Sequence, residues 1–371
     1  MATKSSKKSS TKYSGGPRAT KRDSTRKSKF NYCIQPEVKE RAFDREIHAD
    51  RARLIRSLDR KWANGTRLHY YFFTSPGSLS GSSGERDIVR QAFDEWKNVG
   101  IGLEFAEVDS IDEAEIRIGF LRGDGAWSYM GRDILDQGQT ARTMNFGWNI
   151  SNDIDTAIHE IGHTLGFPHE HQNPNAGIVW DEEKVYDALA QPPNSWSRDT
   201  TYWNIIRKLP QSEVEGSGWD KDSIMHYPFE AGLILQPEEF RTTDLVPGPG
   251  LSARDREWVR SLYPPLTDND YDVLVPYRSV QATLDPGEQL NFYVRPSATR
   301  VYNFATFGSS DTVMVLFEEV DGEPRYLTGD DDSGYSLNAS FDHKLFAGRT
   351  YILRVRLYWQ HREGDFGVMT W

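Results

Sequence analysis

Residues 159–171, HEIGHTLGFPHEH, leave few options for the local fold and its chemistry. If this segment is helical, His159 and His163 lie one turn apart on one face, where both imidazoles can reach one ion. Gly166 follows, and a residue without Cβ lets the helix stop and the chain bend. That bend can bring in His169 as a third imidazole. Three neutral imidazoles around zinc leave one coordination position open, as in catalytic zinc sites.

Glu160 lies next to the first of these histidines and can reach a metal-bound water without being a ligand. Its carboxylate can take the proton of that water and act as a general base. The alternative is an ordinary exposed glutamate on a helix. The three flanking histidines favour the catalytic interpretation.

The pattern HExxHxxGxxH, followed downstream by SIMHY at residues 223–227, resembles the metzincin proteases and, with Glu170 directly after the third histidine, their astacin branch. The resemblance covers about residues 62–263. It implies zinc-dependent endopeptidase activity, with Met225 as a hydrophobic base under the zinc site and Tyr227 moving between zinc and substrate, where its hydroxyl can stabilise an oxyanion. Outside that family, Met225 and Tyr227 would be ordinary buried side chains.

Two further roles depend on the resemblance. In astacins the residue that matches Glu170 meets the processed amino terminus. The segment WSYMG, which includes Trp127, Ser128 and Tyr129, is an expected edge strand to which an extended substrate adds in antiparallel fashion. An ordinary sheet strand without a substrate role is the alternative for these three residues.

The chain departs from the animal astacins in two respects. Cys33 is its only cysteine, so no disulfide can form within the chain. Residues 172–177, shortly after the third histidine, read QNPNAG, without the Arg and Asp that usually stand there. The segment VWDEEKVY instead resembles bacterial and fungal astacin-like proteins.

Cys33 lies just ahead of the expected catalytic domain, in FNYCIQPEV. A thiolate is a strong zinc ligand, so an extended segment carrying one can fill the open position and keep an enzyme latent. Other metzincins use such a cysteine, whereas animal astacins use an aspartate. An incidental buried thiol is the commoner role of a single cysteine.

The hydrophobic patterns predict an α+β fold of the metzincin type. Strand-like runs such as LHYYFF and AEIRIGF surround a helical run, ERDIVRQAFDEWKNV, and a second helix ends before Pro264. We expect a mixed twisted sheet with an active-site helix and a C-terminal helix, followed by a small all-β sandwich. The expected divisions are a disordered basic tail (1–29), a charged segment resembling a pro-segment (30–61), the zinc protease domain (62–266) and the sandwich (267–371).

The last hundred residues resemble the pre-peptidase C-terminal domain of secreted bacterial proteases, through stretches such as FGSSDTVMVLFEE. Asp330, Asp331 and Asp332 offer oxygen ligands that suit calcium. An acidic turn of this kind is more often simply solvated. Calcium is therefore an expectation secondary to the single catalytic zinc.

Charge and composition separate the remaining function classes. Residues 1–29 carry ten Lys or Arg against one acid, which leaves 34 basic and 54 acidic residues, a net charge of −20, for the rest. Nucleic acid is therefore not an expected partner of the folded part, although a basic tail can bind polyanions.

No apolar run suits a membrane span or a signal peptide, although the family resemblance implies secretion. Protein or peptide substrates are the expected partners, and a catalytically inactive zinc-containing binding module is the alternative. The oligomeric state is not predicted.

Overall fold

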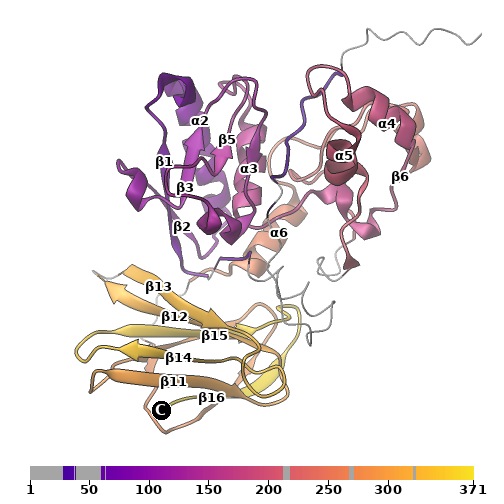
Figure 1. The fold of residues 1–371 in the computed structure, drawn as a ribbon. Coiled ribbons are helices and arrows are strands. Elements are labelled where there is room, and N and C mark those ends of the chain that lie inside the picture. The colour runs from indigo at the N-terminus through magenta and orange to yellow at the C-terminus, as the bar shows by residue number, and fades with distance from the viewer. Residues whose placement is uncertain are drawn as a thin grey trace, which may run out of the picture.

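A computed structural model describes residues 28–36, 38, 60–62, 64–211, 218–266, 271–320 and 323–371. The basic tail before Ser28 and most of the weak helix expected over residues 36–61 lie outside the described residues. Figure 1 shows a sheet with two helices, a second helical region beside it, and a β-sandwich below the sheet region. In the described part of the chain, none of the helices has the length and apolar character that a bilayer crossing requires.

The first sheet has the strand order β2-β1-β3-β5-β4. The four strands from β2 to β5 in this order are parallel, whereas β4 pairs antiparallel with β5 and forms one edge. This mixed sheet confirms the fold expected from the sequence. The strands are β1 (Arg67–Phe72), β2 (Glu104–Glu107), β3 (Ile116–Gly119), β4 (Trp127–Ser128) and β5 (Met144–Asn145).

Three helices complete this part of the fold: α2 (Ser83–Asn98), α3 (Ile154–Thr164) and α6 (Ala253–Leu262). Ser82 and Ser252 begin α2 and α6 with reciprocal capping boxes, which satisfy backbone donors that a helix leaves free at its start. One buried face of α2 presents Val89, Phe93 and Trp96 to the same core as the sheet strands and α3. The indole of Trp96 donates to the carbonyl of Ile158 (3.0 Å), so α2 positions α3 directly.

A second core lies beside the first and belongs to the region at the right of Figure 1. Its buried residues include Trp180, Val185, Ile205 and Phe229. The elements here are β6 (Val179–Trp180), α4 (Glu182–Leu189), α5 (Arg198–Thr201), a π-helical turn (Tyr202–Ile206) and β7 (Ile234–Gln236). Short 3-10 helices occur at Gly77–Leu79, Ile111–Glu113, Gly131–Asp136, Glu170–Gln172, Pro174–Ala176 and Glu238–Arg241.

The C-terminal region is a sandwich of two sheets, with strand orders β13-β12-β15-β10-β8 and β14-β11-β16-β9. Apolar side chains from both sheets, such as Leu316, Leu353, Phe304 and Phe366, form one buried cluster. The all-β prediction for this region is therefore confirmed. Its strands are β8 (Asp272–Val273), β9 (Val280–Leu284), β10 (Gln289–Val294), β11 (Arg300–Phe307), β12 (Thr312–Val320), β13 (Glu323–Asp330), β14 (Ser340–Leu345), β15 (Tyr351–Leu357) and β16 (Gly364–Thr370).

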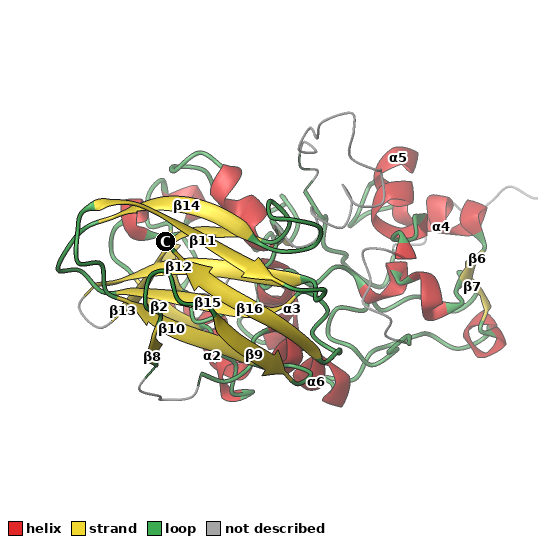
Figure 2. Ribbon diagram, turned by 90° about the horizontal axis from the view of Figure 1, so that it is seen from below, coloured by secondary structure: helices red, strands yellow, loops and turns green. Residues whose placement is uncertain are grey.

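The sandwich lies against the underside of the first region (Figure 2). Asn64 donates to the side chain of Gln289 (3.0 Å), and Arg356 and Gln360 both donate to the carbonyl of Leu262 at the end of α6 (3.3 and 3.4 Å). These contacts join the protease region to the sandwich across the domain boundary expected near residue 266. That boundary stays a prediction.

The expected calcium site at Asp330, Asp331 and Asp332 is not supported. The carboxylate of Asp330 accepts the backbone N–H groups of Ser333 (2.9 Å) and Ser340 (2.8 Å), so it stabilises the turn itself. Within the residues that the structure describes, the one group of three or more potential ligands close enough to share an ion lies elsewhere.

Candidate metal centre

Helix α3 supplies the first two histidines. Asp153 caps its start by accepting the N–H of Thr156 (3.2 Å). His159 Nδ1 is bonded to the carbonyl of Ile224 (2.7 Å) and His163 Nδ1 to that of Phe167 (2.8 Å). Because each Nδ1 bonds an acceptor, it carries the proton, and Nε2 is left with its lone pair free to bind a metal.

The turn after α3 brings in the third histidine. Gly166 has φ +93°, in the left-handed region that favours glycine, and the chain reverses there as the sequence predicts. A Cβ on Gly162 would meet the sulfur of Met225, so the SIMHY turn approaches the helix where it has no side chain. Met225 is buried, and its carbonyl accepts the N–H of Glu170 (3.0 Å), the residue after His169.

Four potential ligands converge at this point: Cys33, His159, His163 and His169. Their ligand atoms all lie within 4.8 Å of one another, and all four residues are buried. The Cys33 sulfur lies 3.5 Å from His163 Nε2 and 3.6 Å from His169 Nε2, which are themselves 3.0 Å apart. The structure brings together the three histidines expected from the spacing and Cys33, for which the sequence offers both a zinc-ligand role and an incidental one.

The electrostatics of the centre follow from its burial. Burial lowers the pKa of His159 to about 4 and those of His163 and His169 well below the usual range, with neighbouring imidazoles adding to the effect on the last two. Burial raises the pKa of Glu160 to about 8 and that of the Cys33 thiol well above its usual value. The three imidazoles are therefore neutral and able to donate lone pairs.

Glu160 and Tyr227 border the centre. Glu160 is fully buried; its Oε2 accepts from the Cys33 thiol (3.7 Å), and no partner is found for its Oε1 among the described residues. The Tyr227 hydroxyl donates to the carbonyl of Cys33 (2.7 Å) and lies 2.6 Å from His169 Nε2. Both side chains that the sequence predicts to be catalytic thus face the converging ligands.

Residues 28–36 run between the two cores and carry Cys33 to the centre (Figure 1). On one side, the backbone N–H of Ile34 donates to the carbonyl of Ala126 (3.1 Å), and the side-chain amide of Gln35 donates to the carbonyl of Ser128 (3.0 Å). The expected edge strand at Trp127, Ser128 and Tyr129 therefore has this segment beside it. On the other side, Asn194 bonds the backbone of Phe30 and Tyr32.

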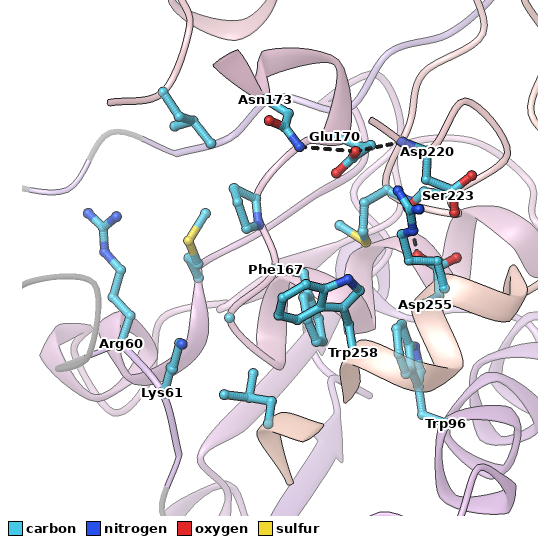
Figure 3. Close-up of a pocket in the computed structure, with 17 residues that line it drawn as sticks. Arg60, Lys61, Trp96, Phe167, Glu170, Asn173, Asp220, Ser223, Asp255 and Trp258 are labelled. Carbon is cyan, nitrogen blue, oxygen red and sulfur yellow. Dashed lines mark hydrogen bonds between the residues drawn. The ribbon is translucent and has the colours of Figure 1, made fainter. Parts of the chain in front are cut away.

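Glu170 lies outside the four-residue cluster and lines a cavity of about 150 Å³ behind the SIMHY turn (Figure 3). Its carboxylate accepts from Asp220 N (2.9 Å) and from the Asn173 amide (3.3 Å), and burial raises its pKa to about 7. Arg60 and Lys61 line the same cavity. Two residues of the expected pro-segment therefore line the same cavity as Glu170.

His171 and His226 lie outside the four-residue cluster. His171 Nε2 bonds the carbonyl of Asn204, and its ring stacks on Tyr227. The sequence does not predict the residues that bond residues 28–36 and hold them in place: Asn194, Asn204, Glu230 and Asp244. No local signal marks them, because each contact joins positions more than 160 residues apart.

Comparisons with known proteins agree with this geometry. The family model described as Astacin, a peptidase family, matches residues 54–233. The chain is 34% identical to Protein SpAN of Strongylocentrotus purpuratus over 152 residues and 31% identical to Bone morphogenetic protein 1 of Xenopus laevis over 182 residues, which are 40% and 48% of this chain. It spans 22% of the length of each of these relatives.

A solved structure of myroilysin is 32% identical and superposes with a TM-score of 0.50, covering 56% of this chain and 97% of that one. The pre-peptidase C-terminal domain of a Bacillus anthracis collagenase matches 29% of this chain at 14% identity and a TM-score of 0.24. With the three histidines, the glycine turn and the SIMHY turn in their expected arrangement, the chain belongs to the astacin family of peptidases.

Proposed function

We propose that this protein is a zinc-dependent endopeptidase that residues 28–36 hold in a latent form. The observation that carries the proposal is the convergence of three neutral imidazoles, one thiol and a buried carboxylate in a cleft occupied by the chain's own peptide. Family membership supports the same reaction class.

The residues at the centre fit a zinc ion. No partner is found for His159 Nε2 among the described residues although the atom is buried, and leaving such an atom unpaired is costly. Nitrogen and sulfur donors are those that zinc prefers in proteins. Zinc bound by His159, His163 and His169 would supply a Lewis acid that polarises the scissile carbonyl and activates water.

Glu160 is the proposed general base. Its carboxylate takes a proton from the attacking water and passes it to the leaving amine, which requires a pKa not far from neutrality. Burial in this cleft raises its pKa in that direction, to about 8. The other oxygen, which has no partner among the described residues, is available to hold the water.

Tyr227 is the proposed oxyanion donor. Its hydroxyl already donates to a peptide carbonyl at the centre, that of Cys33, at 2.7 Å. A substrate carbonyl in the same place would receive the same hydrogen bond, which strengthens as negative charge develops on the oxygen.

The edge of β4 is the proposed substrate strand. Trp127, Ser128 and Tyr129 pair with the sheet on one side only. On the free side, the carbonyl of Ala126 accepts the backbone N–H of Ile34, and that of Ser128 accepts the side-chain amide of Gln35, both from the latent segment, residues 28–36. We infer that an extended substrate adds here antiparallel to β4, through main-chain hydrogen bonds.

Cys33 explains latency in this proposal. Its sulfur lies next to His163 and His169, where it would compete with water for a zinc ion held by the histidines, and the charge of that ion would favour the thiolate. The carbonyl of Cys33 also occupies the Tyr227 hydroxyl. Both the water position and the oxyanion donor are therefore blocked by one residue.

The proposal is tested with casein. We expect the full chain to cleave casein after treatment with a thiol-modifying mercurial, to lose this activity with a chelator, and to regain it with added zinc. Stoichiometric zinc without cleavage of any substrate would instead favour the alternative, an inactive zinc-containing binding module. Binding to heparin that depends on residues 1–29, without zinc, would favour a polyanion-binding protein.

Replacing His169 by alanine tests the ligand set. Two imidazoles bind zinc more weakly than three, so the variant should lose both zinc and activity. His343→Ala, a change on β14 in the sandwich, is the matched control and should keep both. Zinc content by atomic absorption is the measurement, and an unchanged stoichiometry in the His169 variant would show that His169 is not a ligand.

A further inference from the structure

Lys29 is the residue of the latent segment that makes its clearest ionic contact. Its ammonium Nζ lies 2.9 Å from Asp244 Oδ2, and its backbone N–H donates to Glu230 Oε1 (2.7 Å). Asp244 is held in place because its other oxygen accepts the N–H of Ala231 (2.8 Å). A basic side chain and its own main chain are thus recognised together by two carboxylates.

The direction of the segment shows which part of a substrate would reach this place. The backbone N–H of Ile34 donates to the carbonyl of Ala126, and the side-chain amide of the next residue, Gln35, donates to the carbonyl of Ser128. From this order we infer that the segment runs parallel to β4. A substrate antiparallel to β4 runs the opposite way. Its residues before the scissile bond lie along β4, and those after it pass toward Lys29.

The distance along the chain between Lys29 and Cys33 indicates which substrate residue would reach the place of Lys29. Lys29 precedes Cys33 by four residues, a span of about 13 Å in extended chain at about 3.3 Å per residue. When the scissile carbonyl lies at the centre, the third or fourth residue after the scissile bond reaches the place that Lys29 occupies. Asn194 bonds the backbone between these points and would keep a substrate extended.

The charges on this side of the centre agree in sign. A cavity of about 330 Å³ extends here, and outside the metal centre the described residues that line it include the carboxylates of Asp153 and Asp155. Lys29 is the one lysine or arginine among those described lining residues. Departure of the segment therefore removes the positive charge and leaves a negative surface, which favours basic substrates and opposes acidic ones.

We propose that Asp244 and Glu230 form a subsite that selects a lysine or arginine at the third or fourth residue after the scissile bond. The proposal rests on the endopeptidase function proposed above. In the latent chain Lys29 fills this subsite in place of the substrate. The ion pair is partly exposed, with 47% of the Lys29 and 30% of the Asp244 side chain accessible, so a moderate selectivity is expected.

The test uses the full chain carrying Cys33→Ser and a peptide series with one fixed cleavage site. Lysine, norleucine or glutamate is placed in turn at the first to fifth positions after the scissile bond, and kcat/KM is measured. Lysine at the third or fourth position should exceed norleucine by about threefold or more, and glutamate by about tenfold or more. The advantage should shrink at high salt.

Variants assign this preference to the two carboxylates. Asp244→Asn with Glu230→Gln should abolish the lysine advantage, so that the lysine, norleucine and glutamate peptides of each position are cleaved at rates within about twofold of one another. The control is Glu238→Gln, an exposed carboxylate of the same region that pairs with Arg241, which should keep the full preference. A preference that is absent, that falls at another position, or that survives in the double variant overturns the proposal.

A second measurement distinguishes failure of the endopeptidase proposal from failure of the subsite proposal. If no peptide is cleaved, the endopeptidase proposal fails, and the subsite is then decided by calorimetric titration of the same chain with the lysine and glutamate peptides. Binding of the lysine peptide at least about threefold more tightly, lost in the double variant, supports the subsite. Equal dissociation constants overturn it.

Discussion

Replacing Glu160 by glutamine should lower turnover by at least about 10²-fold while zinc content stays near one per chain. Glutamine has nearly the same shape but cannot accept the proton of the attacking water. The side chain is fully buried beside the three histidines and is not among their bonded partners, so the ligands should stay in place. The measurement is kcat/KM on a casein-derived peptide with the mercurial-treated chain, together with zinc analysis.

Two controls make this result specific. Glu238→Gln makes the same chemical change at an exposed position and should leave turnover unchanged. The thermal unfolding midpoint of Glu160→Gln should not fall, because burial disfavours the ionised carboxylate and the neutral amide removes that cost. Near-normal turnover in the Glu160 variant would refute the proposed mechanism, whereas loss of zinc would show that the carboxylate supports the metal site.

The parts of this fold that the sequence predicts well are those determined by local chemistry. Helix α3 begins at an Asp153 cap and ends before Gly166, and both residues are recognisable without any tertiary information. The strand-like runs LHYYFF and AEIRIGF overlap β1 and β3, whose buried apolar residues lie in the core. The three histidines follow from helical spacing plus one glycine turn.

The parts that the sequence predicts poorly depend on distant contacts. Lys29 is assigned by composition to a solvated basic tail, yet its ammonium pairs with Asp244, 215 positions away. Asn194 is an ordinary loop residue until it bonds the backbone of Phe30 and Tyr32. For Cys33, the sequence raises two roles and favours the incidental one. Only the folded chain brings its sulfur to within 3.6 Å of two histidines 130 and 136 positions away.

Replacing Cys33 by serine should make the full chain active without any proteolytic processing, at least about tenfold above the untreated parent, because a hydroxyl is a much weaker zinc ligand than a thiolate. The remaining contacts of Asn194 and Asp244 with the segment should still slow substrate entry, so adding Asn194→Ala should raise activity further. A mercurial should activate the parent and leave the serine variant unchanged, since Cys33 is the only cysteine. Initial rates on a quenched fluorescent peptide, with gels to confirm that the chain stays intact, are the measurement. If parent and variant are equally active before any cleavage, the thiol does not hold the enzyme latent, and the contacts of residues 28–36 are then structural.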